Sequence, residues 1–371
     1  MDTQRILPSD LVRDWLLTSA VQITTGADSG GVAGWLNSSL QPEYLYLEIT
    51  GYYLSSMAFI ATTDPALKDE AVARAELALG WLERLLNDSV HLPTRKYINQ
   101  TEQDWRNQAV FSFDIGMVIR GIAAILPLCT DRARCETLLA AYVDRLRPFF
   151  ENCSTLKSHI ALDNSVVMPD KWSTRQDPHQ LKIVSGFLFV PSDFQDRECL
   201  LGVLNGVLQQ CRAPFPGDAI ALDMHPTHYY LEGAATTALH GYSDISLEQV
   251  AGIYRRIMKH QMPDGCLPSN LVSPDAVVRS DVIAQALRIG SILRDLGYLT
   301  DAQELEQLDR LYAALLKFIA PSGAVSFFPI DGAHPTFWNA WCAMFAHQAL
   351  ALYEQGEPSN SLVEEQLRSL I

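Results

Sequence analysis

The stretch His228-Tyr-Tyr-Leu-Glu-Gly233 opens an apolar segment that predicts a helix over 226–241. His228 and Glu232 are four residues apart, and Tyr229 and Glu232 are three apart, so the three side chains are neighbours on a helix. An imidazole, a phenol and a carboxylate at a helix start suit proton transfer on a polar substrate. The same residues also fit a buried aromatic helix start whose polar tips bond to the backbone. Related stretches recur along the chain, which favours a shared site.

Length, composition and charge exclude several classes of protein. Of the 371 residues, 48% are hydrophobic, so the chain can bury a sizeable core. The formal net charge of −15 argues against a nucleic-acid partner or an anionic membrane surface. The N-terminus lacks the basic-then-apolar plan of a signal peptide, and the most apolar run, 116–128, is too short to span a bilayer. We therefore expect no nucleic-acid binding and no membrane insertion.

The seven cysteines are scattered and form no C-x-x-C pair. This pattern predicts neither a disulfide framework nor a cysteine zinc site, and it favours a cytoplasmic location. His225, His228 and Asp223 offer a metal-binding alternative, but Pro226 interrupts the helix between the histidines and no H-E-x-x-H motif supports it. No phosphate-binding glycine loop is evident either. We expect no metal and no cofactor.

Periodicity and helix-end signals predict twelve helical segments and little strand. In chain order they cover 8–20, 43–62, 65–87, 107–128, 131–148, 178–190, 194–212, 226–241, 247–261, 278–296, 301–319 and 335–354, with a further short helix at about 360–370. The odd-numbered segments are amphipathic; the apolar stripe of 301–319 consists of Leu305, Leu308, Leu311, Leu315 and Ile319. The even-numbered segments are apolar on most sides, which is typical of buried helices.

The connections alternate in the same way. Links that lead into an even-numbered segment are long, and several carry a glycine turn before a short apolar run, as at 28–31, 263–268 and 321–328. These turns predict brief β-hairpins. The alternation predicts an all-α fold, an (α/α)6 toroid in which six inner helices all begin at one mouth and the long loops surround it. We expect one domain over 1–371; an irregular helical bundle is the alternative.

Acidic and aromatic side chains gather where the inner helices should begin. A lone charge on an apolar helix needs a partner or a wet cavity, so the arginines at 106, 120, 279 and 288 are the structural alternative to a site. The candidate catalytic residues are Glu232, Asp114, Glu48 and Asp281. The candidate substrate-binding residues are His228, Tyr229, Arg279, Tyr44, Trp35, Trp105, Asp264, Trp338 and Trp341. Aromatic rings stack on sugars, and paired carboxylates supply the acid and base at a glycosidic carbon, so we expect a saccharide substrate.

Five short segments carry a resemblance to the six-hairpin (α/α)6 carbohydrate-active superfamily. They are Glu48-Ile-Thr-Gly-Tyr52, Phe113-Asp-Ile-Gly116, His228-Tyr-Tyr-Leu-Glu-Gly233, Gln261-Met-Pro-Asp-Gly265 and Arg279-Ser-Asp-Val-Ile-Ala-Gln285. They are similar to segments of bacterial proteins of this fold that are found with exopolysaccharide-biosynthesis genes. The resemblance implies a saccharide-binding funnel at the mouth, with Asp or Glu residues for hydrolysis or with Tyr, His and Arg for elimination or epimerisation. No hydrolase signature matches residue by residue.

We therefore predict a carbohydrate-active enzyme in which Glu232 and Asp114 form the acid/base pair. Glu48 and Asp281 are alternates that hold hydroxyls or a water, and Arg279 favours an anionic group such as a uronate carboxylate. Two alternatives stay open. One is a uronate lyase or epimerase that relies on tyrosine, histidine and arginine; the other is a non-catalytic saccharide-binding component of polysaccharide biosynthesis.

Overall fold

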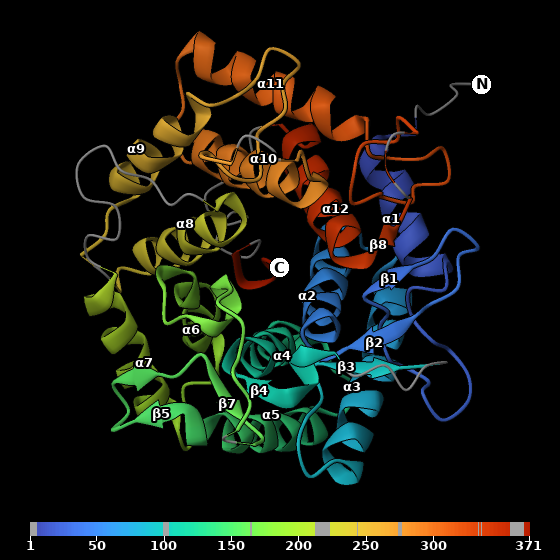
Figure 1. Ribbon diagram of the computed structural model, residues 1–371, viewed down its shortest axis with the longest axis vertical. Coiled ribbons are helices and arrows are strands. Elements are labelled where there is room, and N and C mark those ends of the chain that lie inside the picture. The colour runs from blue at the N-terminus through green and yellow to red at the C-terminus, as the bar shows by residue number, and fades with distance from the viewer. Residues whose placement is uncertain are drawn as a thin grey trace.

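A ring of helices makes up most of the molecule (Figure 1). The computed structural model describes residues 6–98, 104–163, 165–211, 223–242, 244–273, 277–332, 334, 336–356 and 367–371. Within these ranges the inner helices are α2 (Leu47–Thr63), α4 (Ser112–Ile125), α6 (Leu181–Ser185), α8 (Met224–Leu239), α10 (Ser280–Asp295) and α12 (Ala340–Glu354). The outer helices are α1 (Pro8–Thr18), α3 (Lys68–Asp88), α5 (Arg132–Leu146), α7 (Arg197–Gln210), α9 (Leu247–Met258) and α11 (Ala302–Leu316). The predicted (α/α)6 toroid is confirmed.

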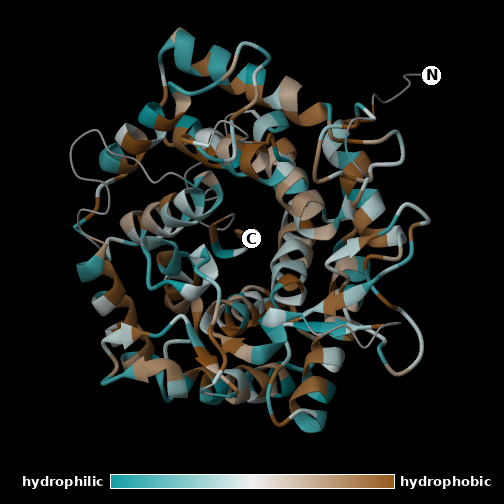
Figure 2. Ribbon diagram, viewed as in Figure 1, coloured by the Kyte–Doolittle hydropathy of each residue, from teal (hydrophilic) through white to brown (hydrophobic). Residues whose placement is uncertain are grey.

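Burial separates the two sets of helices as the sequence predicts. Every residue of α4 is buried, and α2 is buried from Leu47 to Ala61. The outer helix α11 buries only a stripe, formed by Leu308, Leu311, Ala314 and Leu315, while the predicted stripe residue Leu305 stays exposed. Hydrophilic and hydrophobic residues accordingly alternate along the α11 ribbon in Figure 2. The inner helices form the hydrophobic core and the outer helices cover it.

Two glycines bring α2 and α4 into backbone contact. A Cβ atom at Gly51 would lie 2.5 Å from the carbonyl oxygen of Met117, and one at Gly121 would lie 2.3 Å from the carbonyl oxygen of Gly51. Only glycine permits such an approach, because any side chain would enter the facing helix. The close packing sets the first turns of α2 and α4 side by side.

Short strands join neighbouring loops around the mouth. β1 (Trp35–Leu36) pairs with β8 (Trp338–Asn339), β2 (Tyr44–Tyr46) with β3 (Arg95–Tyr97), and β4 (Ala109–Phe111) with β7 (His159–Ala161), all antiparallel. β5 (Phe150–Glu151) and β6 (Thr155–Leu156) form a local hairpin. Isolated bridges also close the predicted glycine turns at 28–31 and 321–328, between Gln22 and Val32 and between Ile319 and Val325. The rim is therefore built from loops that are remote in sequence.

These strands explain why three inner helices begin later than predicted. Residues 44–46, 109–111 and 338–339 have extended backbone in the strand ladders, so α2, α4 and α12 begin at residues 47, 112 and 340. The predicted segment 178–190 is one short α-helix flanked by the 3-10 turns Pro178–Gln180 and Gly186–Phe189.

By contrast, α8 begins earlier than predicted, at Met224, because Asp223 caps it. The Asp223 carboxylate accepts a hydrogen bond of 3.3 Å from the backbone N–H of His225. Pro226 falls in the first turn of α8, where backbone N–H groups have no carbonyl partner within the helix, so the missing N–H of proline breaks no helical hydrogen bond. His225 is thus a first-turn residue.

Residues 367–371 fill the axis of the ring at the end away from the mouth. Leu367 and Leu370 pack against Phe59, Ile292 and Leu352, which lie near the ends of inner helices. Arg120 donates to the carbonyl oxygens of Leu370 (2.9 Å) and Leu367 (3.1 Å), Lys182 donates to that of Ile371 (2.6 Å), and Gln348 to that of Ser369 (2.7 Å). The cavity at the mouth therefore has a closed floor. Most of the predicted helix at 360–370 lies outside the described residues.

Two cysteine pairs correct the prediction that the chain has no disulfides. Cys129 is bonded to Cys135 and Cys153 to Cys199, while Cys211, Cys266 and Cys342 are free and buried. Cys153 and Cys199 meet because the loop after α5 packs on α7, where a Cβ at Gly202 would lie 2.7 Å from the carbonyl oxygen of Cys153. Cysteine spacing therefore gives no support for a reducing compartment. Among the described residues, no helix is long and apolar enough to cross a membrane.

Candidate active site

A cavity of about 300 Å³ opens at the mouth, between the first turns of α2, α4 and α8 and the loops beside them. This is at the lower end of the volumes typical of small-molecule sites. Its wall carries two carboxylates, four cationic side chains, a histidine, two tyrosines and four tryptophans. These are Glu48, Asp114, Arg95, Arg106, Lys171, Arg279, His225, Tyr46, Tyr229, Trp35, Trp105, Trp172 and Trp341.

Glu48 and Asp114 are the two carboxylates of the cavity, and they come from the closely packed helices α2 and α4. Glu48 Oε1 accepts a hydrogen bond of 2.6 Å from Tyr52, and Asp114 Oδ2 accepts one of 2.7 Å from Thr94. Burial raises the pKa of both carboxyl groups, and the charge of Glu48 raises the pKa of Asp114 further. Two carboxyls that resist joint ionisation are suited to share acid and base roles.

Asp104 holds two arginines beside this pair. Its carboxylate contacts Arg95 Nη1 at 2.6 Å and Arg106 Nη1 at 3.1 Å. The Arg95 guanidinium also lies over the ring of Tyr44, 4.4 Å from its centre. Tyr44 therefore packs against Arg95 and does not line the cavity itself. Both arginines counteract the effect of burial on the pKa of Glu48 and Asp114.

A second polar group forms where α8 and α10 begin. Arg279 donates through Nε to Asp281 Oδ1 at 3.1 Å and through Nη2 to Oδ2. His225 Nδ1 lies 2.7 Å from Gln285 Oε1 and 3.4 Å from Asp281 Oδ2. Burial lowers the pKa of His225, which favours the neutral ring at pH 7. Asp281 is fully buried, so it orients Arg279 and His225 and does not reach the cavity.

Aromatic rings form two walls. Trp35 stacks on Phe337 at 5.3 Å and lies 6.1 Å from Trp341, and its indole N–H donates to Glu43 at 2.8 Å. Trp172 lies 5.7 Å from the ring of His225 and 5.8 Å from that of Tyr229. Flat rings of this kind stack on the apolar faces of sugars, and here they flank the two carboxylates.

The structure brings together about half of the residues that the sequence nominated. Those that line the cavity are Glu48, Asp114, Tyr229, Arg279, Trp35, Trp105 and Trp341. Those that do not line it are Glu232, Asp281, His228, Tyr44, Asp264 and Trp338. Asp264 is exposed on its turn, with its carboxylate 3.4 Å from Lys317, and Trp338 is part of the β1–β8 ladder.

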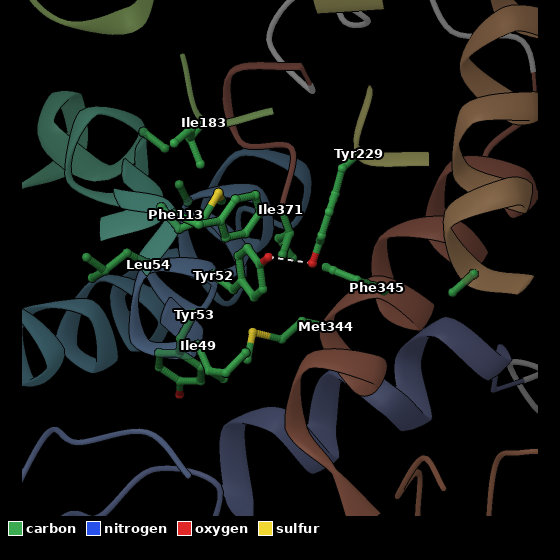
Figure 3. Close-up of a cluster of buried hydrophobic side chains, with 14 of the residues drawn as sticks. Ile49, Tyr52, Tyr53, Leu54, Phe113, Ile183, Tyr229, Met344, Phe345 and Ile371 are labelled. Carbon is green, nitrogen blue, oxygen red and sulfur yellow. Dashed lines mark hydrogen bonds between the residues drawn. The ribbon is translucent and has the colours of Figure 1, made fainter. Parts of the chain in front are cut away.

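Glu232 lies deep in the ring because it follows His225 by seven residues, which is about 10 Å of helix rise. It is buried between Lys182, whose Nζ is 2.8 Å away, and Arg288. Burial alone would raise the pKa of Glu232, but the two cations lower it below its ordinary value. His228 is also fully buried, and burial lowers its pKa to about 4. Figure 3 shows Tyr52, Tyr229 and Phe345 together in the buried interior of the ring, with Ile371 near them.

Six of the ionisable residues and tryptophans in this wall were not among the candidate catalytic or substrate-binding residues: Tyr46, Arg95, Arg106, Lys171, Trp172 and His225. Of these, His225 was considered only as a metal ligand and Arg106 only as a partner for a buried carboxylate. Trp172 is an aromatic residue of a long loop, like Trp35 and Trp105, so the same criterion would have found it. His225 would have been found by treating Asp223 as the helix cap. Nothing in the local sequence marks Arg95 or Lys171.

Comparison with known proteins supports the fold. No family model matches the chain, and no curated protein matches it by sequence. Among solved structures, a cellobiose 2-epimerase from Bacillus thermoamylovorans B4167 superposes with a TM-score of 0.68 at 13% identity, covering 92% of this chain and 98% of that one. A D-mannose isomerase superposes with a TM-score of 0.69 at 12% identity, covering 95% of this chain and 99% of that one. An unsaturated glucuronyl hydrolase specific for heparin superposes with a TM-score of 0.66 at 10% identity, covering 94% of this chain and 97% of that one. At these identities the likeness shows the toroid fold.

Proposed function

We propose that the protein is a carbohydrate-active enzyme that hydrolyses a glycosidic bond in an anionic oligo- or polysaccharide, with Glu48 and Asp114 as its acid/base pair. The main support is the placement of two buried carboxylates at the starts of adjoining inner helices, in one cavity walled by tryptophans. The names of the structural neighbours, which include an epimerase, an isomerase and a glucuronyl hydrolase, support a sugar substrate. Glu48 replaces Glu232 in the predicted pair.

The surroundings of the two carboxyls suggest their roles. The pKa of Asp114 is raised well above its ordinary value, so Asp114 is the better proton donor to the leaving glycosidic oxygen. Glu48 would take a proton from the water that attacks the anomeric carbon, or attack that carbon itself. When Glu48 acts as the base, its proton returns through solvent to Asp114 after the reaction; when Glu48 attacks, Asp114 takes a proton from the water that then releases the sugar from Glu48. In both routes one water adds across the cleaved bond and both carboxyls regain their starting protonation.

The charge of the cavity favours an anionic sugar. Four cationic side chains, Arg95, Arg106, Lys171 and Arg279, line the cavity with two carboxylates, although the whole chain carries a net charge of −15. The carboxylates that pair with the three arginines, Asp104 and Asp281, do not line it. Positive charge concentrated in a cavity with low-dielectric walls attracts anions. The planar guanidinium groups also match the geometry of a carboxylate. A uronate-containing glycan, such as an exopolysaccharide, is the substrate class that fits.

One observation favours a second candidate function. His225 lines the cavity as a neutral ring oriented by Asp281 and Gln285, and its centre lies 4.4 Å from that of Tyr229. The charge of Arg279, which also lines the cavity, helps to lower the pKa of His225. A neutral imidazole beside a guanidinium can abstract a proton next to a sugar carboxylate, which is the first step of epimerisation or elimination.

Matched variants separate these possibilities. We would measure thermal shifts with uronic-acid, neutral and amino oligosaccharides, followed by product analysis in D₂O. The proposal expects a shift with uronic-acid oligosaccharides that Glu48→Gln and Asp114→Asn retain, while turnover falls by about 10²–10⁴-fold. Carbon-bound deuterium that His225→Asn abolishes would establish the second function. Binding without turnover by the natural protein would identify a non-catalytic component of polysaccharide biosynthesis. No shift with any saccharide at millimolar concentration would contradict all three.

A further inference from the structure

A chain of hydrogen bonds connects two residues of the cavity through one that lies outside it. Tyr52 is one turn after Glu48 on α2 and is fully buried. Its hydroxyl donates to Glu48 Oε1 at 2.6 Å and lies 2.6 Å from the hydroxyl of Tyr229 on α8, the contact dashed in Figure 3. Glu48 and Tyr229 both line the cavity, whereas Tyr52 does not.

The number of protons fixes the direction of this chain. Each phenol has one proton to donate, and an ionised carboxylate can only accept. When Glu48 is ionised, Tyr52 donates to it and Tyr229 donates to Tyr52, so the Tyr229 oxygen can only accept from a ligand. When Glu48 is protonated and donates to Tyr52, both phenols reverse, and Tyr229 donates toward the cavity. No net proton transfer between the residues is needed.

We infer that Tyr52 is a positioning residue that couples the protonation state of Glu48 to the hydrogen-bonding role of Tyr229 toward the sugar. With Glu48 ionised, Tyr229 would accept a hydrogen bond from a sugar hydroxyl; with Glu48 protonated, it would donate to a sugar oxygen. The inference rests on the proposed function, since it treats Glu48 as the group that gains and loses a proton during the reaction.

Other ionisable groups also surround the ends of the chain. Tyr46 from β2, Asp114 from α4, Arg95 from β3 and Arg106 from the turn before β4 act on Glu48 or on its neighbour Asp114. Glu48, Glu232 and Asp281 act on Tyr229, and His225 packs against its ring. Among the residues that the structure describes, Tyr52 is the one hydrogen-bonded to both Glu48 and Tyr229. Its removal should therefore act through this coupling.

The test compares Tyr52→Phe with Tyr53→Phe. Tyr53 is the next residue of α2 and is equally buried, but its hydroxyl has no hydrogen-bond partner among the described residues. The first measurement is the unfolding temperature between pH 5 and pH 9 without ligand. The pKa of Glu48 is raised in the folded state, so its unfavourable effect on stability grows as the pH rises from the unfolded-state pKa to the folded-state pKa, and is constant above it.

Loss of the Tyr52 hydrogen bond raises the pKa of Glu48 further. The destabilisation by Tyr52→Phe should therefore grow with pH, by about 3–5 °C over this range. Tyr53→Phe should change the unfolding temperature by the same amount at every pH. In a Glu48→Gln background, the pH-dependent part of the Tyr52→Phe effect should disappear. Tyr229→Phe removes the hydrogen bond at the other end of the hydrogen-bond chain, and it should give a smaller pH-dependent loss of stability.

The second measurement uses the uronic-acid oligosaccharide that gives the largest thermal shift. Tyr52→Phe should move the limb of the kcat/KM profile that belongs to Glu48 by about one to two pH units to higher pH. The inference would be overturned if Tyr52→Phe lowered the unfolding temperature by the same amount at every pH, or if a pH-dependent loss persisted in the Glu48→Gln background. If Tyr52→Phe does not fold, a pH-independent loss in Tyr229→Phe would overturn it. If the coupling is present but Glu48→Gln keeps full turnover, the proposed function fails instead.

Discussion

Glu232 and Glu48 are both buried carboxylates on inner helices, yet their surroundings give them opposite properties. Glu232 lies between Lys182 and Arg288, whose charges keep it ionised. Glu48 instead accepts a hydrogen bond from the neutral phenol of Tyr52, and burial raises its pKa. An ionised group held by two cations is part of the scaffold. A buried carboxyl that can change its protonation state is suited to proton transfer.

This contrast predicts opposite effects of the same substitution. Glu232→Gln should lower the free energy of unfolding by about 3–5 kcal/mol, because it leaves two buried cations without their partner. Glu48→Gln should leave it unchanged or raise it by up to about 1 kcal/mol, since a carboxyl that burial disfavours is replaced by an amide. Urea denaturation at pH 7 measures both. Equal losses for the two variants would contradict the distinction.

The raised pKa of Asp114 predicts how activity depends on pH. A proton donor must be protonated, so turnover should fall as the pH rises through the raised pKa of Asp114. Arg106 lowers that pKa by its charge, so Arg106→Gln should move the alkaline limb to higher pH, by roughly half to one unit.

The matched control is Arg134→Gln, on the outer helix α5, which should leave the limb in place. An unmoved limb in Arg106→Gln would show that Asp114 does not govern it. The profile of kcat/KM against pH is the measurement.

At the scale of helices and strands, the sequence predicts the order and kind of elements well and their starts less well. Apolar periodicity is local, so it identified the helices α1–α12 of the described residues and their alternation between buried and amphipathic. The starts of α2 and α4 depend on strands from distant loops, which no local pattern reveals. For the same reason Arg95, held at the cavity through the β2–β3 ladder, was missed, and Glu232 was placed about two turns too near the mouth.

Close packing of α2 and α4 predicts that Gly51→Ala disturbs the site. The added methyl group would meet the backbone of Met117 at 2.5 Å and force apart the helices that carry Glu48 and Asp114. We expect a loss of about 1–3 kcal/mol in stability and a larger relative loss in turnover than in binding.

Gly252→Ala on α9 is the control, because its methyl group would meet no atom within 4 Å. It should stabilise the protein by about 0.5–1 kcal/mol, as alanine does in a helix interior. Thermal unfolding and steady-state kinetics measure both variants. Full turnover in a folded Gly51→Ala protein would show that the spacing of the two helices is not critical.

At the scale of the molecule, the axis of the ring is filled by residues 367–371, which overlap the short helix that the sequence predicts at about 360–370. Residues 367–371 accept hydrogen bonds from Arg120, Lys182 and Gln348, so these three buried side chains find their partners in backbone that is remote from them in sequence. Periodicity finds helices that pack on their neighbours, but it cannot show that this short segment lies on the axis of the ring. The sequence alone therefore predicted the toroid and its mouth, but not its closed floor.

Deletion of residues 367–371 should therefore destabilise the whole ring. It removes the carbonyl oxygens that Arg120 contacts at 2.9 and 3.1 Å and the one that Lys182 contacts at 2.6 Å, which leaves buried cations undersatisfied. A double-mutant cycle with Arg120→Met separates this effect from the loss of apolar packing. Because both changes remove the same hydrogen bonds, their combined effect on unfolding free energy should be smaller than the sum by about 0.5–3 kcal/mol. Strict additivity would show that the Arg120 hydrogen bonds are not how the segment stabilises the ring.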